Sequence, residues 1–123
     1  MSLYKIPEPD SETLEAAFRA YRLAVEYERR VILKWEPRDV ELRKLGEFNR
    51  TRIAWENEIY LAEEVRKFAS DILLRTASCY GRLYGMDQVL YDALSKRKDR
   101  NLIRVLRAVE KAFVLFRERM KKS

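Results

Sequence analysis

Residues 99–121, DRNLIRVLRAVEKAFVLFRERMK, form the stretch that most clearly decides the fold. Asp99 stands just before the apolar pattern, where a side-chain oxygen accepts hydrogen bonds from the unpaired amides of a first helical turn. Large apolar side chains then recur in steps of three and four residues, the spacing of one helix face; they are Leu102, Leu106, Val109, Phe113, Phe116 and Met120. We therefore expect a helix that is capped by Asp99, ends near Lys121 and buries this face.

The opposite face of the same segment is basic. At ~100° per residue, five cations fall within about 60° of one another, nearly opposite the apolar face: Arg100, Arg104, Arg107, Lys111 and Lys122. A basic link precedes them, and the predicted phosphate-contacting set is Lys96, Arg97, Lys98, Arg100, Arg104, Arg107 and Lys111. Residues 96–123 hold eleven Lys or Arg and three acidic residues, a charge of +8, whereas residues 1–95 carry −2. Such a ridge can neutralise phosphates and release their counterions, and the forked guanidinium of arginine suits that contact.

Upstream, the sequence predicts a first helix over about Glu12 to Lys34, with Asp10 or Ser11 as its cap. Its expected packing stripe repeats in steps of four and three; it consists of Leu14, Phe18, Tyr21, Val25, Ile32 and Trp35. Glu28 is the one polar interruption. A carboxylate there is either a catalytic acid with a raised pKa or, as we favour, one half of an ion pair with an arginine that fixes the helix register.

Pro37 fits the first turn of a second helix, where its missing amide hydrogen costs nothing. We expect a bend or break at Gly46–Asn49, because glycine inside a helix costs ~1 kcal/mol relative to alanine. The alternative is an unbroken helix from Pro37 to Tyr84, a rod of about 72 Å that would have to protrude or pair with another chain. Asn49 can cap the long helix that follows and runs to about Gly81. A short helix over about Asp87 to Leu94 completes the set.

These elements predict an all-α fold: a four- to five-helix bundle with one long central helix and a basic amphipathic C-terminal helix. The chain of 123 residues is about one domain long and holds only three glycines and three prolines. We expect an extended N-terminal arm at residues 1–9, where Pro7 and Pro9 lie, and a single helical domain over residues 10–123. No apolar run reaches the ~20 residues of a membrane span and the N-terminal residues lack a signal-peptide pattern, so we expect a cytoplasmic protein.

Acidic residues stand four positions before basic ones throughout the chain, a spacing that stabilises helices through ion pairs. The predicted pairs are Glu15–Arg19, Glu26–Arg30, Asp39–Arg43, Glu63–Lys67, Asp71–Arg75 and Glu118–Lys122. Asn and Gln together occur at only four positions, and this bias against heat-labile amides, combined with dense charge, is typical of thermophile proteins.

The residues needed for common enzyme chemistry are missing, and we predict a non-catalytic protein. There is no histidine, the commonest general base and transition-metal ligand. The three glycines do not form a phosphate-binding loop. Cys79 stands alone, with no base within its helical turn, and is expected to be a small buried hydrophobe. We expect no cofactor.

One acidic pattern is a candidate metal site. Glu12 and Glu15, followed by Glu36 and Asp39, resemble the paired acidic motifs with which all-α MazG-type nucleotide pyrophosphohydrolases hold magnesium. In this chain about 21 residues, or ~30 Å of helix, separate the two pairs. An antiparallel hairpin cannot bring them together, so we expect first-turn acids and no metal site.

Two binding roles remain open, and neither is enzymatic. The first is association with DNA or RNA through the basic ridge, with Tyr80, Tyr84 and Tyr91 as candidates for base stacking, although aromatics at helical spacing more often belong to a core. The second is a structural or adaptor role, as a homo-oligomer or with a protein partner, through apolar residues left over from the packing stripes. These are Trp55, Ile59, Ile103, Val114 and Leu115. We expect no membrane partner, because the apolar face of the last helix is needed for the core. In outline alone, a small basic helical bundle resembles helical subunits of replication and RNA-guided effector complexes and small proteins of archaeal viruses, a likeness that assigns no residues.

Overall fold

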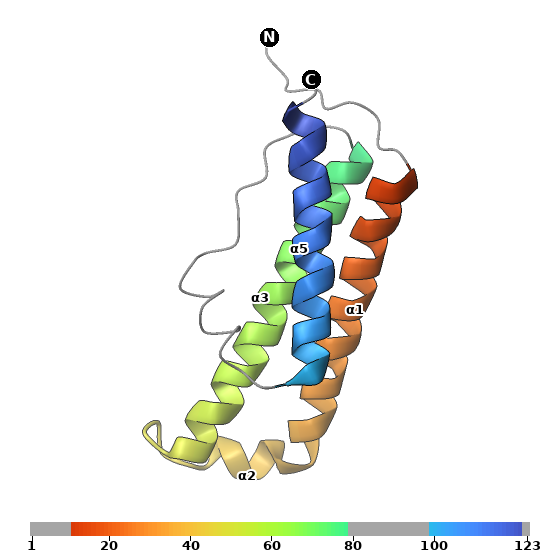
Figure 1. Cartoon of the computed structure of the whole chain (residues 1–123). Helices are drawn as coiled ribbons and strands as arrows, with labels where there is room; N and C mark the ends of the chain where they lie inside the picture. Colours follow the sequence, from red (N-terminus) through yellow and green to blue (C-terminus); the bar gives the residue numbers. More distant parts are fainter. Residues whose placement is uncertain (1–10, 79–98, 122–123) are drawn as a thin grey trace.

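The computed structural model describes residues 11–78 and 99–121, and every regular element within them is a helix (Figure 1). Three predictions fall outside these residues: the arm at 1–9, the helix at 87–94, and the C-terminal partner of the Glu118–Lys122 pair. Cys79, the three tyrosines proposed for stacking and the basic link of Lys96, Arg97 and Lys98 also lie outside them. The all-helical class is confirmed for the described part of the chain.

Three long helices lie side by side. Helix α1 (Ser11–Trp35) runs in the opposite direction to α3 (Arg50–Ser78) and α5 (Arg100–Lys121), which run parallel to one another (Figure 1). Between α1 and α3 the chain turns through a 3-10 helix, η1 (Glu36–Arg38), and a short helix, α2 (Asp39–Arg43). Helix α1 contacts both other long helices extensively and is therefore the central one, not α3 as the sequence pattern suggested.

Helix boundaries follow the predicted capping residues. The Asp99 side chain accepts hydrogen bonds from the amides of Asn101 (2.9 Å) and Leu102 (3.4 Å) at the start of α5. Asn49 does the same for α3, accepting from the amides of Thr51 at 2.9 Å and Arg52 at 3.2 Å. The predicted break near Gly46 is confirmed, although α2 ends earlier than expected, at Arg43.

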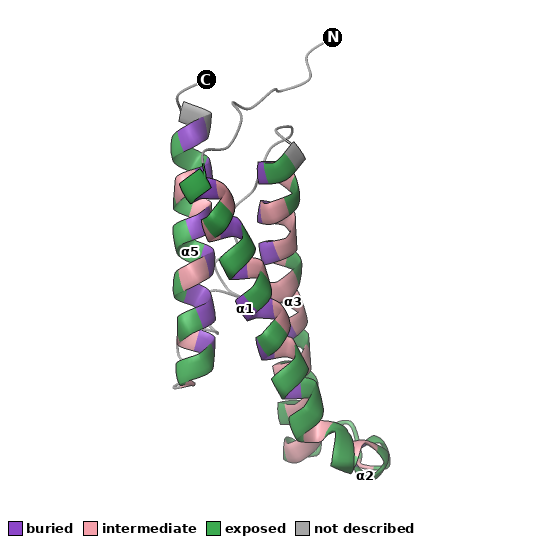
Figure 2. Cartoon of the chain, turned by 90° about the vertical axis from the view of Figure 1, so that its right-hand side faces the viewer, coloured by how far each residue is buried: buried purple, intermediate pink, exposed green. Residues whose placement is uncertain are grey.

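The apolar core lies where the three long helices meet (Figure 2). The predicted stripe of α5 is confirmed for its described side chains, because Leu102, Leu106, Val109 and Phe116 are buried and Phe113 packs against the core. Phe113 also meets Phe68 of α3 with 5.7 Å between the ring centroids.

The predicted packing stripe of α1 is wrong by one residue. Phe18 and Ile32 are exposed, and the buried positions are instead Thr13, Ala17, Ala20, Leu23, Ala24, Tyr27 and Val31. A shift of one residue turns a helix face by ~100°. The pattern was misread because alanine adds little to a hydrophobic stripe, whereas small side chains let a central helix approach two neighbours closely.

The helices differ in how far they extend. Helix α5 begins part of the way along the α1–α3 hairpin, so the end that carries α2 projects beyond it (Figures 1 and 2). Large hydrophobic side chains remain exposed at that end, among them Leu33 at 56%, Val40 at 70% and Phe48 at 90%. No helix within the described residues has the length and apolar character that crossing a membrane requires.

Candidate nucleic-acid interface

Helices α1 and α5 together present a basic surface. The four described cations of the predicted ridge are all exposed on α5, and Arg19 of α1 lines the same surface depression as they do. That depression has a volume of about 420 Å³. Two neighbouring depressions are continuous with the first, since they share lining residues with it. One shares Arg19 and Lys111 and adds Arg22 of α1, and the other shares Arg104 and adds Arg30 of α1. We call these side chains the cationic surface: Arg19, Arg22, Arg30, Arg100, Arg104, Arg107 and Lys111.

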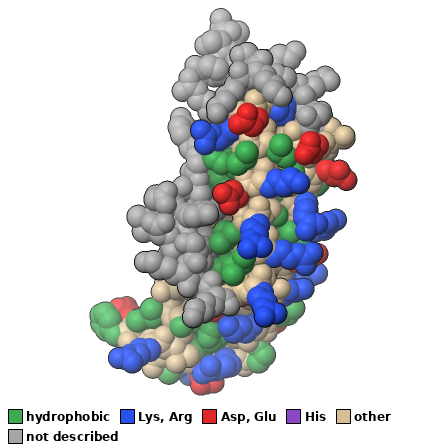
Figure 3. Space-filling model, viewed as in Figure 1, with side chains coloured by type: hydrophobic (Ala, Val, Ile, Leu, Met, Phe, Trp, Pro, Cys, Tyr) green, Lys and Arg blue, Asp and Glu red, His purple; other side chains and the backbone are tan. Residues whose placement is uncertain are grey.

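Blue side chains gather over the α5 and α1 face in the space-filling view (Figure 3). The sequence placed only the α5 members in the site. Arg19 and Arg30 were missed because Glu15 and Glu26 stand four residues before them, a spacing that predicts neutralised pairs. Arg22 has no acidic residue at that spacing and was not singled out by any pattern.

Those two α1 pairs do not form. No member of the cationic surface makes an ion pair with any residue in the described ranges. By contrast, three predicted pairs elsewhere are confirmed: Arg43 bonds Asp39 at 3.1 Å, Lys67 bonds Glu63 at 3.0 Å and Arg75 bonds Asp71 at 3.1 Å. The missing pairs leave the charge of the cationic surface uncompensated by bonded carboxylates.

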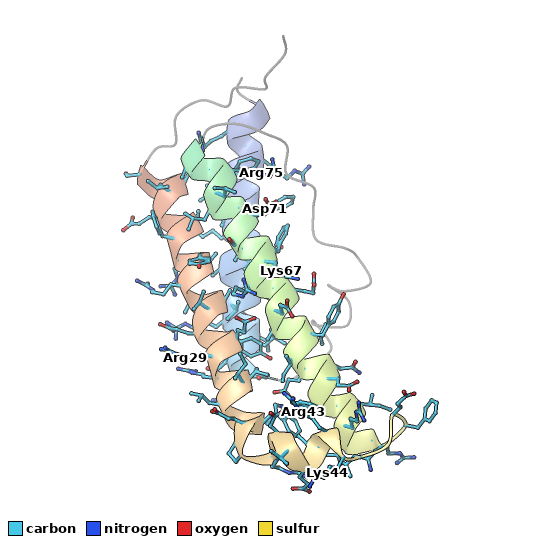
Figure 4. All side chains as sticks on the ribbon, turned by 180° about the vertical axis from the view of Figure 1, so that it is seen from behind. Arg29, Arg43, Lys44, Lys67, Asp71 and Arg75 are labelled. Atoms are coloured by element: carbon cyan, nitrogen blue, oxygen red, sulfur yellow. The ribbon has the colours of Figure 1, made fainter. Side chains whose placement is uncertain are left out.

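On the other side of the molecule Arg43, Lys67 and Arg75 are bonded to carboxylates, whereas Arg29 and Lys44 make no ion pair with a described residue. In the view from behind, Lys67, Asp71 and Arg75 follow one another along α3, while Arg29 of α1 points outward from the opposite edge (Figure 4). The pKa of Lys67 is raised above its ordinary value, first because its ammonium donates a hydrogen bond to Glu63 and then because of the negative charges of Glu63 and Glu64. The charge of Lys67 is therefore neutralised by carboxylates of its own helix.

Glu28 is paired as predicted. Arg66 of α3 donates a hydrogen bond from Nε to Glu28 Oε1 at 2.7 Å, and the two side chains are 33% and 18% exposed. The carboxylate lies between α1 and α3 and holds their register. This contact supports the structural interpretation of Glu28 over the catalytic one.

The acidic residues considered for magnesium lie at opposite ends of α1. Glu12 and Glu15 belong to its first turns, whereas Glu36 opens η1 and Asp39 opens α2 beyond its other end. Within the described residues, no three carboxylate, thiol or imidazole side chains are grouped so as to hold a metal ion.

The predicted protein-interface residues lie on two helices. Trp55 and Ile59 lie on α3, and Ile59 is half-buried against the core. Ile103, Val114 and Leu115 lie on α5, where Val114 is 47% exposed and Ile103 lines the depression with the arginines.

Comparisons with known proteins add no assignment to this geometry: no protein-family model, no curated protein and no solved structure matches the chain.

Proposed function

We propose that this protein is a non-catalytic nucleic-acid-associated protein whose cationic surface binds the phosphate backbone. The observation that carries the proposal is the set of cations on α1 and α5 that lack bonded carboxylates, beside cations on α3 that have them. Unpaired surface cations keep mobile counterions, and a polyphosphate that binds there releases the counterions of both partners.

The dimensions and residue types of the surface suit a backbone. Along α5, Arg100 and Lys111 are eleven positions apart, which at ~1.5 Å per residue is about 16 Å of helix, or roughly five base steps at ~3.4 Å each. Six of the seven cations are arginines, whose planar fork pairs with phosphate oxygens through two parallel hydrogen bonds.

Fluorescence anisotropy of labelled single- and double-stranded oligonucleotides tests this proposal. The key variant is Arg100→Ala/Arg104→Ala/Arg107→Ala. At about 0.1 M salt we expect roughly 100-fold weaker binding or more, because each lost phosphate contact costs about a factor of five to eight there.

A matched control removes the same charge from paired cations. Arg38→Ala/Arg43→Ala/Lys67→Ala also lowers the net charge by three, at exposed side chains that are each bonded to a carboxylate. We expect a loss of less than about threefold, since these cations are already neutralised. Equal losses of affinity in the two triple variants would show that binding depends on net charge alone and would contradict a specific role for the cationic surface.

The apolar residues at the α2 end support a second candidate, a structural or adaptor role. Ile32, Leu33, Val40 and Phe48 are exposed there, and clusters of exposed large hydrophobics mark protein interfaces. Light scattering after size exclusion tests it: a dimeric mass that becomes monomeric in Val40→Ser/Phe48→Ser supports self-association through this end. A monomer at high protein concentration contradicts self-association.

A further inference from the structure

Phe18 lies exposed beside the cationic surface. Its side chain is 54% accessible on α1, because the buried face of that helix is turned by one residue from the predicted stripe. It lines a depression of about 320 Å³ together with Arg19, Arg22 and Lys111. An aromatic ring beside unpaired cations is the combination with which proteins bind unpaired nucleotides, since a base stacks on the ring while the backbone follows the positive charge.

The remaining lining residues indicate which part of a nucleotide fits. Glu12 and Glu15 stand on the same depression, and Ala16 and Ala108 are its small apolar members. The carboxylates repel phosphate, but they can accept hydrogen bonds from the exocyclic amino group of a base such as cytosine. Phosphates are therefore directed toward the arginines and a base toward Phe18.

The same composition disfavours an apolar protein segment in this place. Phe18 is the one large hydrophobic side chain among the eight lining residues, and five of the eight are charged. A segment that docked here would desolvate those charges without pairing them, which is costly. A flat base with polar edges covers the ring and leaves the charges hydrated.

We propose that the Phe18 depression is a base-stacking subsite for single-stranded nucleic acid. The inference rests on the proposed function and adds a preference to it: a duplex, whose bases are already stacked internally, contacts only the cations, whereas a single strand contacts both the cations and Phe18.

The test compares Phe18→Ala with wild type on a labelled single strand of about 16 nucleotides and on the duplex formed with its complement. Stacking contributes ~1–3 kcal/mol per base, so we expect the single strand to bind about 5- to 150-fold more weakly to the variant. Duplex binding should change less than about twofold. Phe18→Trp should retain the wild-type affinity, and its added indole fluorescence should fall when the single strand binds.

Tyr60→Ala is the matched control, because Tyr60 is an aromatic side chain of similar exposure, 56%, on α3, which holds no member of the cationic surface. It should leave both affinities unchanged. Exposed positions are expected to tolerate these changes, and the thermal unfolding of each variant, followed by circular dichroism, checks that.

Two failures are distinguishable. If wild type binds both probes and Phe18→Ala weakens neither, or weakens both equally, the subsite is overturned while backbone binding stands. If neither probe binds at low salt, the proposed function and the subsite are both overturned.

Discussion

Helices α3 and α5 are both rich in charge, yet they use it differently. Residues 50–78 of α3 hold five basic and five acidic side chains, and four of those five basic residues lie in ion pairs. Residues 100–121 of α5 hold seven basic and two acidic side chains. Its four cations on the cationic surface have no ion-pair partner in the described part of the chain.

This contrast separates two roles for a basic residue. A paired cation contributes to the fold, by a few tenths of a kcal/mol at the surface and by more where it is half-buried. An unpaired, exposed cation contributes nothing to folding through a partner and attracts external anions instead. Changes on the cationic surface should therefore affect binding, and changes among the paired cations should affect stability.

The largest expected effect tests whether α1 belongs to the surface. Arg19→Ala/Arg30→Ala removes two cations that the sequence pattern had paired with Glu15 and Glu26. We expect about 30-fold weaker oligonucleotide binding at roughly 0.1 M salt, measured by anisotropy, because two phosphate contacts are lost. The matched control is Arg38→Ala/Arg43→Ala, whose cations are bonded. Unchanged affinity in the Arg19/Arg30 variant would confine the surface to α5.

An intermediate effect is expected for a paired cation of α3. Arg66→Met leaves Glu28 half-buried without its hydrogen bond of 2.7 Å. We expect stability to fall by about 1–2 kcal/mol, reduced from the cost of a fully buried pair because both side chains retain solvent contact. Urea unfolding followed by circular dichroism measures this change, and oligonucleotide affinity should stay within about twofold of wild type. Weaker oligonucleotide binding with unchanged stability would contradict the assignment of Arg66 to the fold.

The smallest effect concerns a cation that is unpaired but inaccessible. Arg119 of α5 is 7% exposed, and its guanidinium nitrogens have no hydrogen-bond partner within the described structure. A buried charge without a partner is costly, and methionine fills a similar volume. Arg119→Met should stabilise the fold by about 1 kcal/mol without weakening nucleic-acid binding. A loss of stability would show that the guanidinium makes a favourable contact.

The sequence predicted best what depends on neighbouring residues. The Asp99 and Asn49 caps, the break at Gly46 and the apolar face of α5 follow from local chemistry and large side chains, and the structure confirms them. The face of α1 was misread because Ala17, Ala20 and Ala24 form a packing surface that hydrophobic periodicity underweights. The place of α1 in the middle of the molecule depends on tertiary packing, which no local pattern encodes.

The candidate site was half predictable for a related reason. Arg100, Arg104 and Arg107 share a helix face, and no acidic residue stands four positions before any of them, so the ridge can be read from spacing alone. Arg19 and Arg30 were hidden, because an acidic residue four positions earlier predicts a pair that these side chains do not make. Phe18 was hidden by the misread face of the same helix.

The most direct test of the account is the salt dependence of binding. The logarithm of the association constant for a single-stranded oligonucleotide is measured against the logarithm of salt concentration for wild type and both triple variants. If six of the cationic-surface residues contact phosphate, the wild-type slope should be about −4. The Arg100/Arg104/Arg107 variant should have a slope shallower by about two units, and the Arg38/Arg43/Lys67 variant should keep the wild-type slope. A wild-type slope near zero, or the same change in both variants, would contradict the claim that unpaired cations on α1 and α5 form a phosphate-binding surface.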